Sequence, residues 1–220
     1  ASRAFQGAPT GIGVYATEIC RGLIEDPPAP LSLYCNSRRP PAAAPPLPPG
    51  SAWRPIPLPR GWTRLRLRLE LSRHPPELLF VPAYRLPPGR LPRAVVTVHG
   101  VEHRLAEQAY PGRSGRAVES FVKDTLARAA RVIVPSETTR ADLVQIYSAD
   151  PSTITVIPHG VAPHLHPRPP AAVAAATAQL GIPGPYFLAV GAHHRRKNIP
   201  FLIRAFARAF PSGPDRPWLV

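Results

Sequence analysis

The sequence predicts an open α/β fold with a mostly parallel sheet, and three observations predict it. Short apolar runs rich in Val, Ile and Leu recur at residues 31–35, 77–81, 94–98, 131–134, 153–157 and 186–190. Runs that are apolar at consecutive positions are typical of strands covered on both faces, as in parallel sheets. Segments with helical spacing of apolar residues lie between these runs. The alternation of strand and helix is the pattern of a doubly wound domain.

Three of the predicted helices follow from apolar residues that recur every three or four positions. Residues 13–24 place Tyr15 on such a face, and residues 116–129 form a longer amphipathic pattern. Residues 136–147 begin at Ser136, whose hydroxyl suits an N-cap position. We therefore expect helices over these three ranges.

Two further segments need a choice between alternatives. Residues 62–73 alternate leucine with charged residues as a half-exposed strand would, but the charged residues are strong helix formers, which favours a helix. A basic helix on a membrane surface is a rival interpretation of this segment, although its leucines form no single face. Residues 171–180 are rich in alanine and predict a helix that ends at Gly181 as its C′ residue.

The segment 186–210 predicts a buried strand, a basic turn and an amphipathic helix in succession. Asn198 is a candidate N-cap, and Pro200 is tolerated in the first helical turn. Arg195, Arg196 and Lys197 would then lie where backbone N–H groups and the helix dipole converge, which is a natural position for a phosphate. A solvated basic loop is the alternative interpretation.

The proline content, the net charge and the cysteines limit which classes of protein the chain can belong to. Proline makes up 33 of 220 residues and gathers in 27–59, 158–170 and 211–217, which indicates linkers between intact apolar segments. The net charge of +14 comes almost wholly from arginine spread along the chain, so it supports binding to nucleic acid only weakly. The two cysteines, Cys20 and Cys35, are expected to be buried reduced thiols, as in a cytosolic protein.

Neither a membrane span nor a signal peptide is predicted. No apolar run reaches the roughly 18 to 20 residues that a bilayer requires. The chain contains no methionine, and we expect it to be trimmed at both ends.

Candidate functional residues follow the predicted strands, because ligands of open parallel sheets bind at the carboxyl ends of the strands. His99 comes directly after one strand, and Glu102 and His103 follow closely enough to orient it. A histidine bonded to the backbone at the sheet edge is the alternative. His99 and His103 have a spacing of four residues but no clear third ligand, so no metal site is predicted. Gly11 and Gly13 open the first helix, where glycines let the backbone approach a ligand.

Five segments together resemble glycosyltransferase family 4, whose members are retaining enzymes of the GT-B architecture that use nucleotide sugars. These segments are GIGVYATEI at 11–19, ELLFVPAYRLP at 77–87, VVTVHGVEH at 95–103, ARVIVPSETTRADL with TVIPHGV within 130–161, and YFLAVGAHHRRKN at 186–198. The resemblance implies two Rossmann-like domains that face each other across a cleft. We expect an N-terminal acceptor-side domain at 1–165, a linker at 166–183 and the start of a nucleotide-sugar-binding domain at 184–220.

The resemblance also implies roles for individual residues. Arg196 and Lys197 match the basic pair that contacts the donor diphosphate, and Gly11 and Gly13 match a glycine loop that offers N–H groups to the donor. His99 matches the family's active-site histidine, which hydrogen-bonds the transferred sugar. Further residues are candidates for the acceptor or sugar cleft, namely Tyr84, Glu102, His103, Ser136 and Glu137.

The sequence departs from the family pattern in three places. Ala192 stands where many members have arginine, so phosphate contact would depend more on Arg196 and Lys197. Residues 158–162 are PHGVA where the family often has PNGVD. The paired glutamates that hold the donor sugar and ribose in the family would lie beyond residue 220. We therefore expect the isolated 220-residue chain to be inactive.

The expected function is transfer of a hexose, with mannose as one candidate, from a nucleotide sugar to a glycan or lipid-linked acceptor with retention. The expected context is polysaccharide or lipopolysaccharide biosynthesis in the cytoplasm, with peripheral contact at the inner face of the membrane. No cofactor, metal or nucleic-acid partner is expected. The alternatives are a non-catalytic basic module that binds nucleic acid or anionic membrane, and a GT-B sugar-nucleotide epimerase.

Overall fold

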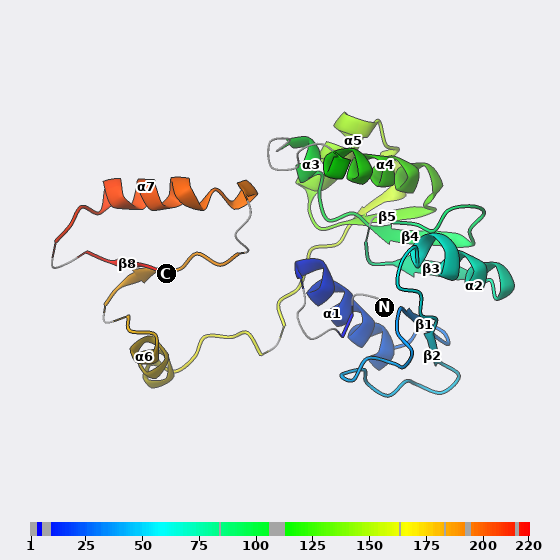
Figure 1. Cartoon of the computed structure of the whole chain (residues 1–220), viewed down its shortest axis with the longest axis horizontal. Helices are drawn as coiled ribbons and strands as arrows, with labels where there is room; N and C mark the ends of the chain where they lie inside the picture. The colour runs from blue at the N-terminus through cyan, green and yellow to red at the C-terminus, as the bar shows by residue number, and fades with distance from the viewer. Residues whose placement is uncertain are drawn as a thin grey trace. The chain divides into compact units, whose positions relative to one another are not determined.

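The computed structural model describes residues 4–5, 10–83, 85–105, 113–162, 164–182, 184–191, 195–213 and 216–220. Contacts along the chain divide it into two compact units. The first unit holds the described residues up to Leu105 together with 113–160, and the second begins at Val161. Figure 1 labels most of the helices and strands of both.

The described part of the first unit contains two parallel sheets. Strand β1 (Ser32–Cys35) pairs with β2 (Ala52–Pro55). The larger sheet has the order β3-β4-β5-β6. Its strands are β3 (Leu78–Val81), β4 (Arg93–Thr97), β5 (Arg131–Val134) and β6 (Ile154–Val156). Every pairing is parallel, which confirms the predicted sheet type.

Helices cover both faces of the larger sheet. Val122 of α4 (Arg113–Arg128) and Leu143 of α5 (Glu137–Tyr147) pack with Val132 and Val134 of β5, so both helices lie on one face, as Figure 1 shows. Helix α1 (Gly11–Glu25) instead reaches Thr97, whose side chain points to the opposite face from its neighbours in β4. The doubly wound arrangement predicted from the sequence is thus present.

The remaining helices of the first unit are short. The segment 62–73 is helical, as predicted, and consists of a π-helical turn (Thr63–Leu67) followed by α2 (Arg68–Arg73). Its inner face is formed by Leu67 and Leu71, which are buried one turn apart. Helix α3 (Glu102–Leu105) follows β4, and a 3₁₀ turn (Pro151–Thr153) precedes β6.

Strand β2 is a feature that the sequence did not predict. Residues 52–55 lie within the proline-rich range 27–59, which was interpreted as a linker around one strand. Parallel pairing with β1 organises this segment, and Pro55 is tolerated at the end of a strand on the sheet edge. Tertiary pairing therefore outweighs local composition here.

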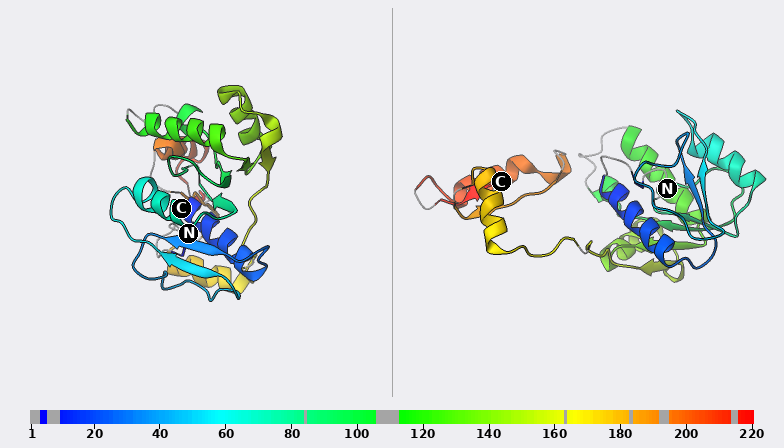
Figure 2. Two further views of the ribbon diagram at one scale, coloured as in Figure 1. Left: turned by 90° about the vertical axis from the view of Figure 1, so that its right-hand side faces the viewer. Right: turned by 90° about the horizontal axis from the view of Figure 1, so that it is seen from below.

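In its described residues the second unit has two α-helices, a 3₁₀ turn and a two-stranded parallel sheet. These are α6 (Pro170–Gln179), β7 (Tyr186–Phe187), a 3₁₀ turn (Arg195–Lys197), α7 (Ile199–Ala209) and β8 (Trp218–Leu219). Figure 2 shows the same elements from two other directions. Gly181 has a φ of +67°, and the N–H groups of Gly181 and Ile182 donate to Ala178 and Thr177. This is a Schellman ending, which confirms Gly181 as the C′ residue.

Two predictions for this unit were wrong in detail. The run 186–190 was expected to be a buried strand, but only Tyr186 and Phe187 pair, and Val190 is 83% exposed. A strand is buried only when helices or other strands pack over it, and the described second unit has few such elements. The run 186–190 therefore stays exposed. Asn198 precedes α7 as predicted, but its backbone is left-handed (φ 49°, ψ 40°) and its side chain makes no capping hydrogen bond.

The cysteine prediction is confirmed, because Cys20 and Cys35 are both buried and unbonded to each other. No helix among the described residues is long and apolar enough to cross a bilayer.

Candidate functional site

Three aromatic side chains meet at the carboxyl edge of the larger sheet, and we call them the ring cluster: Tyr15, His99 and His159. Tyr15 comes from α1, His99 follows β4, and His159 follows β6. The ring centroids of Tyr15 and His99 are 4.7 Å apart with planes at 85°, an edge-to-face contact. His159 lies 4.7 Å from the Tyr15 ring and 5.5 Å from the His99 ring. The cluster thus joins a helix start to two strand ends.

Each of the two side chains in the Tyr15–His99 contact is held by its own hydrogen bond. The hydroxyl groups of Tyr15 and Thr97 are 3.0 Å apart, and Thr97 is fully buried. Nε2 of His99 lies 3.2 Å from the carbonyl oxygen of Pro82. Because a carbonyl can only accept, His99 donates through Nε2–H, and its neutral form then carries the lone pair on Nδ1.

Burial favours that neutral form. Desolvation lowers the pKa of His99, and the nearby His159 lowers it further, while the Pro82 carbonyl and Glu102 act in the opposite direction. The net direction is downward, so His99 is neutral at pH 7. A neutral imidazole can accept a hydrogen bond at Nδ1 but cannot act there as a cation.

Glu102 is brought towards His99 by the turn that follows β4. A Cβ atom at Gly100 would come within 2.8 Å of Oε2 of Glu102, closer than real contacts allow. Glycine at position 100 therefore lets the carboxyl group approach the backbone of this turn. Glu102 and His103 were the two residues predicted to orient His99, and Glu102 is the one that lies near it.

His103 faces elsewhere. It is only 6% exposed, and its Nε2 lies 3.2 Å from Oε2 of Glu119 and 3.1 Å from the hydroxyl of Tyr147. Tyr147 donates to the same Glu119 oxygen at 2.6 Å, and Lys123 lies 3.1 Å from the other oxygen. These bonds lower the pKa of Glu119, although its burial acts the other way. His103 thus ties α3 to α4 and α5, and we leave it out of the proposed site.

The start of α1 forms one border of the ring cluster. The Thr10 side chain caps the helix and accepts from the N–H of Gly13 at 3.3 Å. The first N–H groups of a helix, here those of Gly11 and Ile12, have no acceptor within it. Of the two glycines predicted to face a donor, Gly11 keeps an N–H that α1 does not use, whereas that of Gly13 is already bonded to Thr10.

Ser136 and Glu137 lie at the same sheet edge, after β5. Ser136 caps α5, because its Oγ accepts from the N–H of Thr139 at 3.1 Å. Glu137 is exposed and pairs with Arg140 at 3.5 Å. Both side chains thus have local roles in the first turn of α5. Tyr84, the remaining cleft prediction, lies outside the described residues.

The predicted basic turn belongs to the second unit. Arg195 to Lys197 form a 3₁₀ turn between β7 and α7, as the predicted strand–turn–helix order requires. The methylene carbons of Lys197 lie over the backbone of Gly191, because a Cβ there would be 3.4 Å from Cε of Lys197. Lys197 is exposed, so its ammonium group is open to a ligand.

Two members of the ring cluster were not predicted as site residues. Tyr15 was assigned only to the apolar face of a helix, and His159 was noted as a departure from the family pattern. His159 directly follows β6, so the rule that ligands bind at strand carboxyl ends would have found it. For Tyr15, no local signal distinguishes a core residue from one that reaches the sheet edge.

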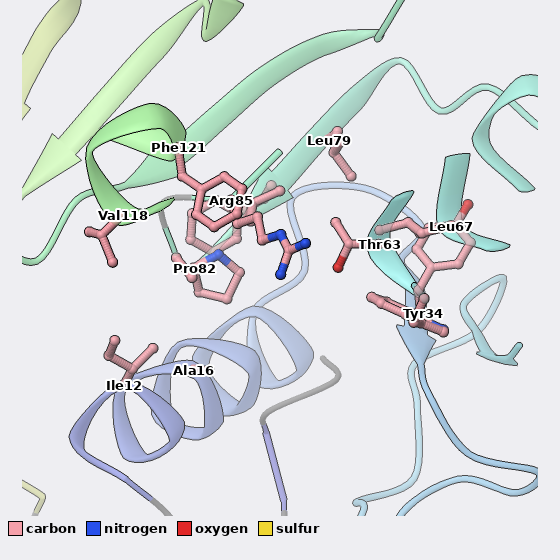
Figure 3. A pocket seen from close by; sticks show the side chains of 14 residues that line it. Ile12, Ala16, Tyr34, Thr63, Leu67, Leu79, Pro82, Arg85, Val118 and Phe121 are labelled. Atoms are coloured by element: carbon pink, nitrogen blue, oxygen red, sulfur yellow. The ribbon is translucent and has the colours of Figure 1, made fainter. Parts of the chain in front are cut away.

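A pocket of about 310 Å³ lies beside this edge in the first unit (Figure 3). Its lining is mostly apolar and comes from α1, β1, β3, the helical segment 62–73 and α4. Pro82 belongs to both the pocket lining and the hydrogen bond of His99. A sugar would find few hydrogen-bond partners among these side chains, so we separate this pocket from the ring cluster. No cluster of three potential metal ligands occurs among the described residues.

Comparison with known proteins identifies the class. The model of the family described as Glycosyltransferase Family 4 matches residues 9–165, well over half of the chain. The chain therefore belongs to glycosyltransferase family 4. No curated protein matches the sequence.

Among solved structures, the chain is similar to sucrose-phosphate synthase from Thermosynechococcus elongatus, with a TM-score of 0.64 and 21% identity. The match covers 94% of this chain and 58% of that structure. At this identity the likeness shows the fold, which is the GT-B architecture of a glycosyltransferase. The chain spans a little over half of the length of this relative.

Proposed function

We propose that the whole protein is a retaining glycosyltransferase that moves a hexose, such as mannose, from a nucleotide sugar to a glycan or lipid-linked acceptor. Family membership supports glycosyl transfer in general, and one observation supports the finer proposal. This observation is His99, which is held neutral at the end of β4, beside the start of α1 and the rings of Tyr15 and His159. Such a place suits recognition of a sugar hydroxyl.

His99 would act on the transferred sugar as a hydrogen-bond acceptor. The Nε2–H group of His99 already donates to the Pro82 carbonyl, so Nδ1 is the atom that can accept a hydrogen bond from a sugar hydroxyl. Because burial keeps the ring neutral, the bond can form at pH 7 without a prior loss of a proton. This is a positioning and stabilising role rather than general base catalysis.

The donor phosphates would be held by backbone and basic groups. The N–H of Gly11 lies at the positive end of the α1 dipole, which favours anions, and Gly13 lies in the same first turn. In the second unit, Arg196 and Lys197 would contact the diphosphate and offset charge that builds up on it in the transition state.

In the proposed reaction the acceptor hydroxyl attacks the anomeric carbon on the face from which the diphosphate leaves. The new carbon–oxygen bond forms as the bond to phosphate breaks, and the hydroxyl proton passes to a phosphate oxygen of the leaving group. The configuration of the sugar is then retained. We place the reaction in cytoplasmic polysaccharide or lipopolysaccharide biosynthesis, at the inner membrane face, without a metal or other cofactor.

Steady-state kinetics of the whole enzyme tests the role of His99. His99→Ala should lower kcat by about fivefold, since one hydrogen bond contributes about 1 kcal/mol, while donor KM changes little. His74→Ala is the matched control, because His74 is exposed at the end of α2. An unchanged kcat in a folded His99→Ala enzyme would remove His99 from the proposal.

The basic turn is tested in the same assay. Lys197→Ala should raise donor KM or lower kcat/KM by tenfold or more, because a charge-assisted contact to phosphate is lost. Arg208→Ala, a change to another exposed cation near the end of α7, should have no such effect. Equal kinetics in the two variants would show that Lys197 does not contact the donor.

The two alternatives are separated by binding and product analysis. A nucleic-acid-binding module would bind duplex tightly with a steep dependence on salt, whereas the proposed enzyme would not. An epimerase would convert the nucleotide sugar without consuming an acceptor. Retention is checked directly by the anomeric configuration of the product.

A further inference from the structure

Tyr15 contacts the end of β4 with both parts of its side chain. Its hydroxyl lies 3.0 Å from the hydroxyl of Thr97, the last residue of β4. Its ring meets the ring of His99 edge-to-face, with the centroids 4.7 Å apart. Thr97 and His99 are two positions apart in the chain. One side chain of α1 thus touches both the strand and the histidine that follows it.

The hydrogen bond to the Pro82 carbonyl does not by itself fix the His99 ring. At 3.2 Å it holds one atom of the imidazole, Nε2. A hydrogen bond keeps most of its strength over a range of angles, and the χ2 torsion of histidine has broad energy wells. The ring can therefore tilt about this bond, and Nδ1 then moves with it. A second contact, made with the ring itself, is needed to set its plane.

The other two rings of the cluster supply contacts of this kind. The planes of the Tyr15 and His99 rings make an angle of 85°, which is an arrangement that aromatic pairs favour. His159 is tilted by 47° to the Tyr15 ring and by 48° to the His99 ring. His159 is exposed, whereas Tyr15 is half-buried. Tyr15 is therefore the more firmly held of the two neighbours of His99.

The position of Tyr15 is itself fixed from two directions. Thr97 is fully buried, so its hydroxyl would be left unsatisfied if the Tyr15 hydroxyl moved away, and this carries a free-energy cost. The next residue of α1, Ala16, is 1% exposed and belongs to the same buried cluster as Leu33 of β1. Helix α1 is thus held against β1 through Ala16 and against β4 through Tyr15.

We propose that Tyr15 is a positioning residue for His99: with its hydroxyl anchored on Thr97, its ring sets the plane of the imidazole and so the direction of Nδ1. Tyr15 lies one helical turn after Gly11, whose N–H is proposed to face the donor phosphate. A shift of α1 along β4 would therefore displace both groups. The effect on catalysis rests on the proposed function, whereas the ring geometry is tested without it.

Exchange of the His99 Nε2–H proton with water tests the geometry in the chain itself. NMR of the chain labelled with ¹⁵N at histidine follows this proton, and His99→Gln identifies its signal by removing it. Tyr15→Leu removes the ring, and the proton should then exchange about tenfold faster, because the hydrogen bond to Pro82 opens more easily. Val14→Ala, a change to the exposed neighbour in α1, is the matched control. Equal rates in these two variants would overturn the proposal.

Two further rates separate positioning from a general loosening of the strand end. The backbone N–H of Val98 donates to the carbonyl of Ile133 at 2.9 Å and should keep its exchange rate in Tyr15→Leu. A rise that matched that of the His99 proton would contradict a role specific to the ring. Tyr15→Phe keeps the ring without the hydroxyl, so it should give an intermediate rate. A rate as high as in Tyr15→Leu would show that the ring contact does not hold His99.

Kinetics of the whole enzyme tests the link to catalysis. Tyr15→Leu should lower kcat by about as much as His99→Ala does, and the double variant should lose no more than His99→Ala alone, because Tyr15 acts through His99. Additive losses would give Tyr15 a role of its own and overturn the positioning role. If His99→Ala leaves kcat unchanged, the proposed role of His99 is wrong, while the exchange rates still decide whether Tyr15 holds the ring.

Discussion

His99 owes its properties to its neighbours more than to its own chemistry. Its ring is held between the Pro82 carbonyl and the edge of Tyr15, and burial keeps it neutral. The sequence predicted the position of this residue, because it follows an apolar run directly. The tautomer and the ring contacts depend on Pro82, His159 and Tyr15, which are 17 to 84 positions away and could not be predicted.

The first prediction concerns stability and pH. The folded pKa of His99 is below its ordinary value of 6.5, so the unfolded chain binds more protons as the pH falls through that value. The contribution of His99 to stability is complete above about pH 6.5 and is lost as the pH falls towards the folded pKa. Urea unfolding between pH 7.5 and 5.5 should show this loss, and His99→Gln should reduce it. His74→Gln is the control, and an equal slope in both variants would contradict the assignment.

The second prediction concerns the hydrogen bond between Tyr15 and Thr97. Tyr15→Phe leaves the fully buried Thr97 hydroxyl without this partner and should lower the free energy of unfolding by about 1 kcal/mol. Adding Thr97→Val removes the orphaned hydroxyl, so the double variant should lose less than the sum of the two single variants. Denaturant unfolding of the four proteins gives the coupling energy. Strict additivity would mean that the bond contributes nothing.

At the scale of elements, helices were predicted more reliably than strands. Residues 62–73 are helical because the charged residues between the leucines favour a helix, and Leu67 and Leu71 then face the core. Strand β2 was missed because its partner β1, rather than its own composition, organises it. Strand β7 is shorter than its apolar run, since a strand extends only as far as a neighbour pairs with it.

The third prediction separates a structural role of Ser136 from a role in the site. Because Ser136 caps α5, Ser136→Ala should lower the free energy of unfolding by about 1 kcal/mol, whereas Ser136→Asp should keep the cap. Thermal or urea unfolding measures this difference. If Ser136→Ala instead left stability unchanged and lowered kcat/KM, Ser136 would be a substrate contact, as the resemblance implied.

At the scale of the whole molecule, the two units differ in the size of their cores. Among its described residues, the first unit has three clusters of buried apolar side chains. In the described part of the second unit, Ile182 and Phe206 are the buried hydrophobic residues, and aromatic contacts of Phe206 with Phe187 and Phe210 supplement them. A small core gives low stability, because less apolar surface is removed from water.

The fourth prediction follows from this difference. Heating should give two transitions, with the second unit unfolding first. Phe206→Ala should lower only the first transition, and Leu143→Ala should lower only the later one, each by several kcal/mol in the free energy of unfolding. Calorimetry with circular dichroism resolves the two. A single transition that both variants lower equally would show that the units fold as one.

The sequence by itself determined the class of this protein: parallel strands, intervening helices and the family motifs that place His99, Gly11 and the basic turn. These are local properties, because hydrophobic periodicity and end residues act within one element. Only the tertiary structure decided that Tyr15 and His159 join His99, that His103 turns to Glu119, and that residues of β1 and β3 line one pocket. Such contacts arise from packing between residues far apart in the chain, and no local pattern encodes them.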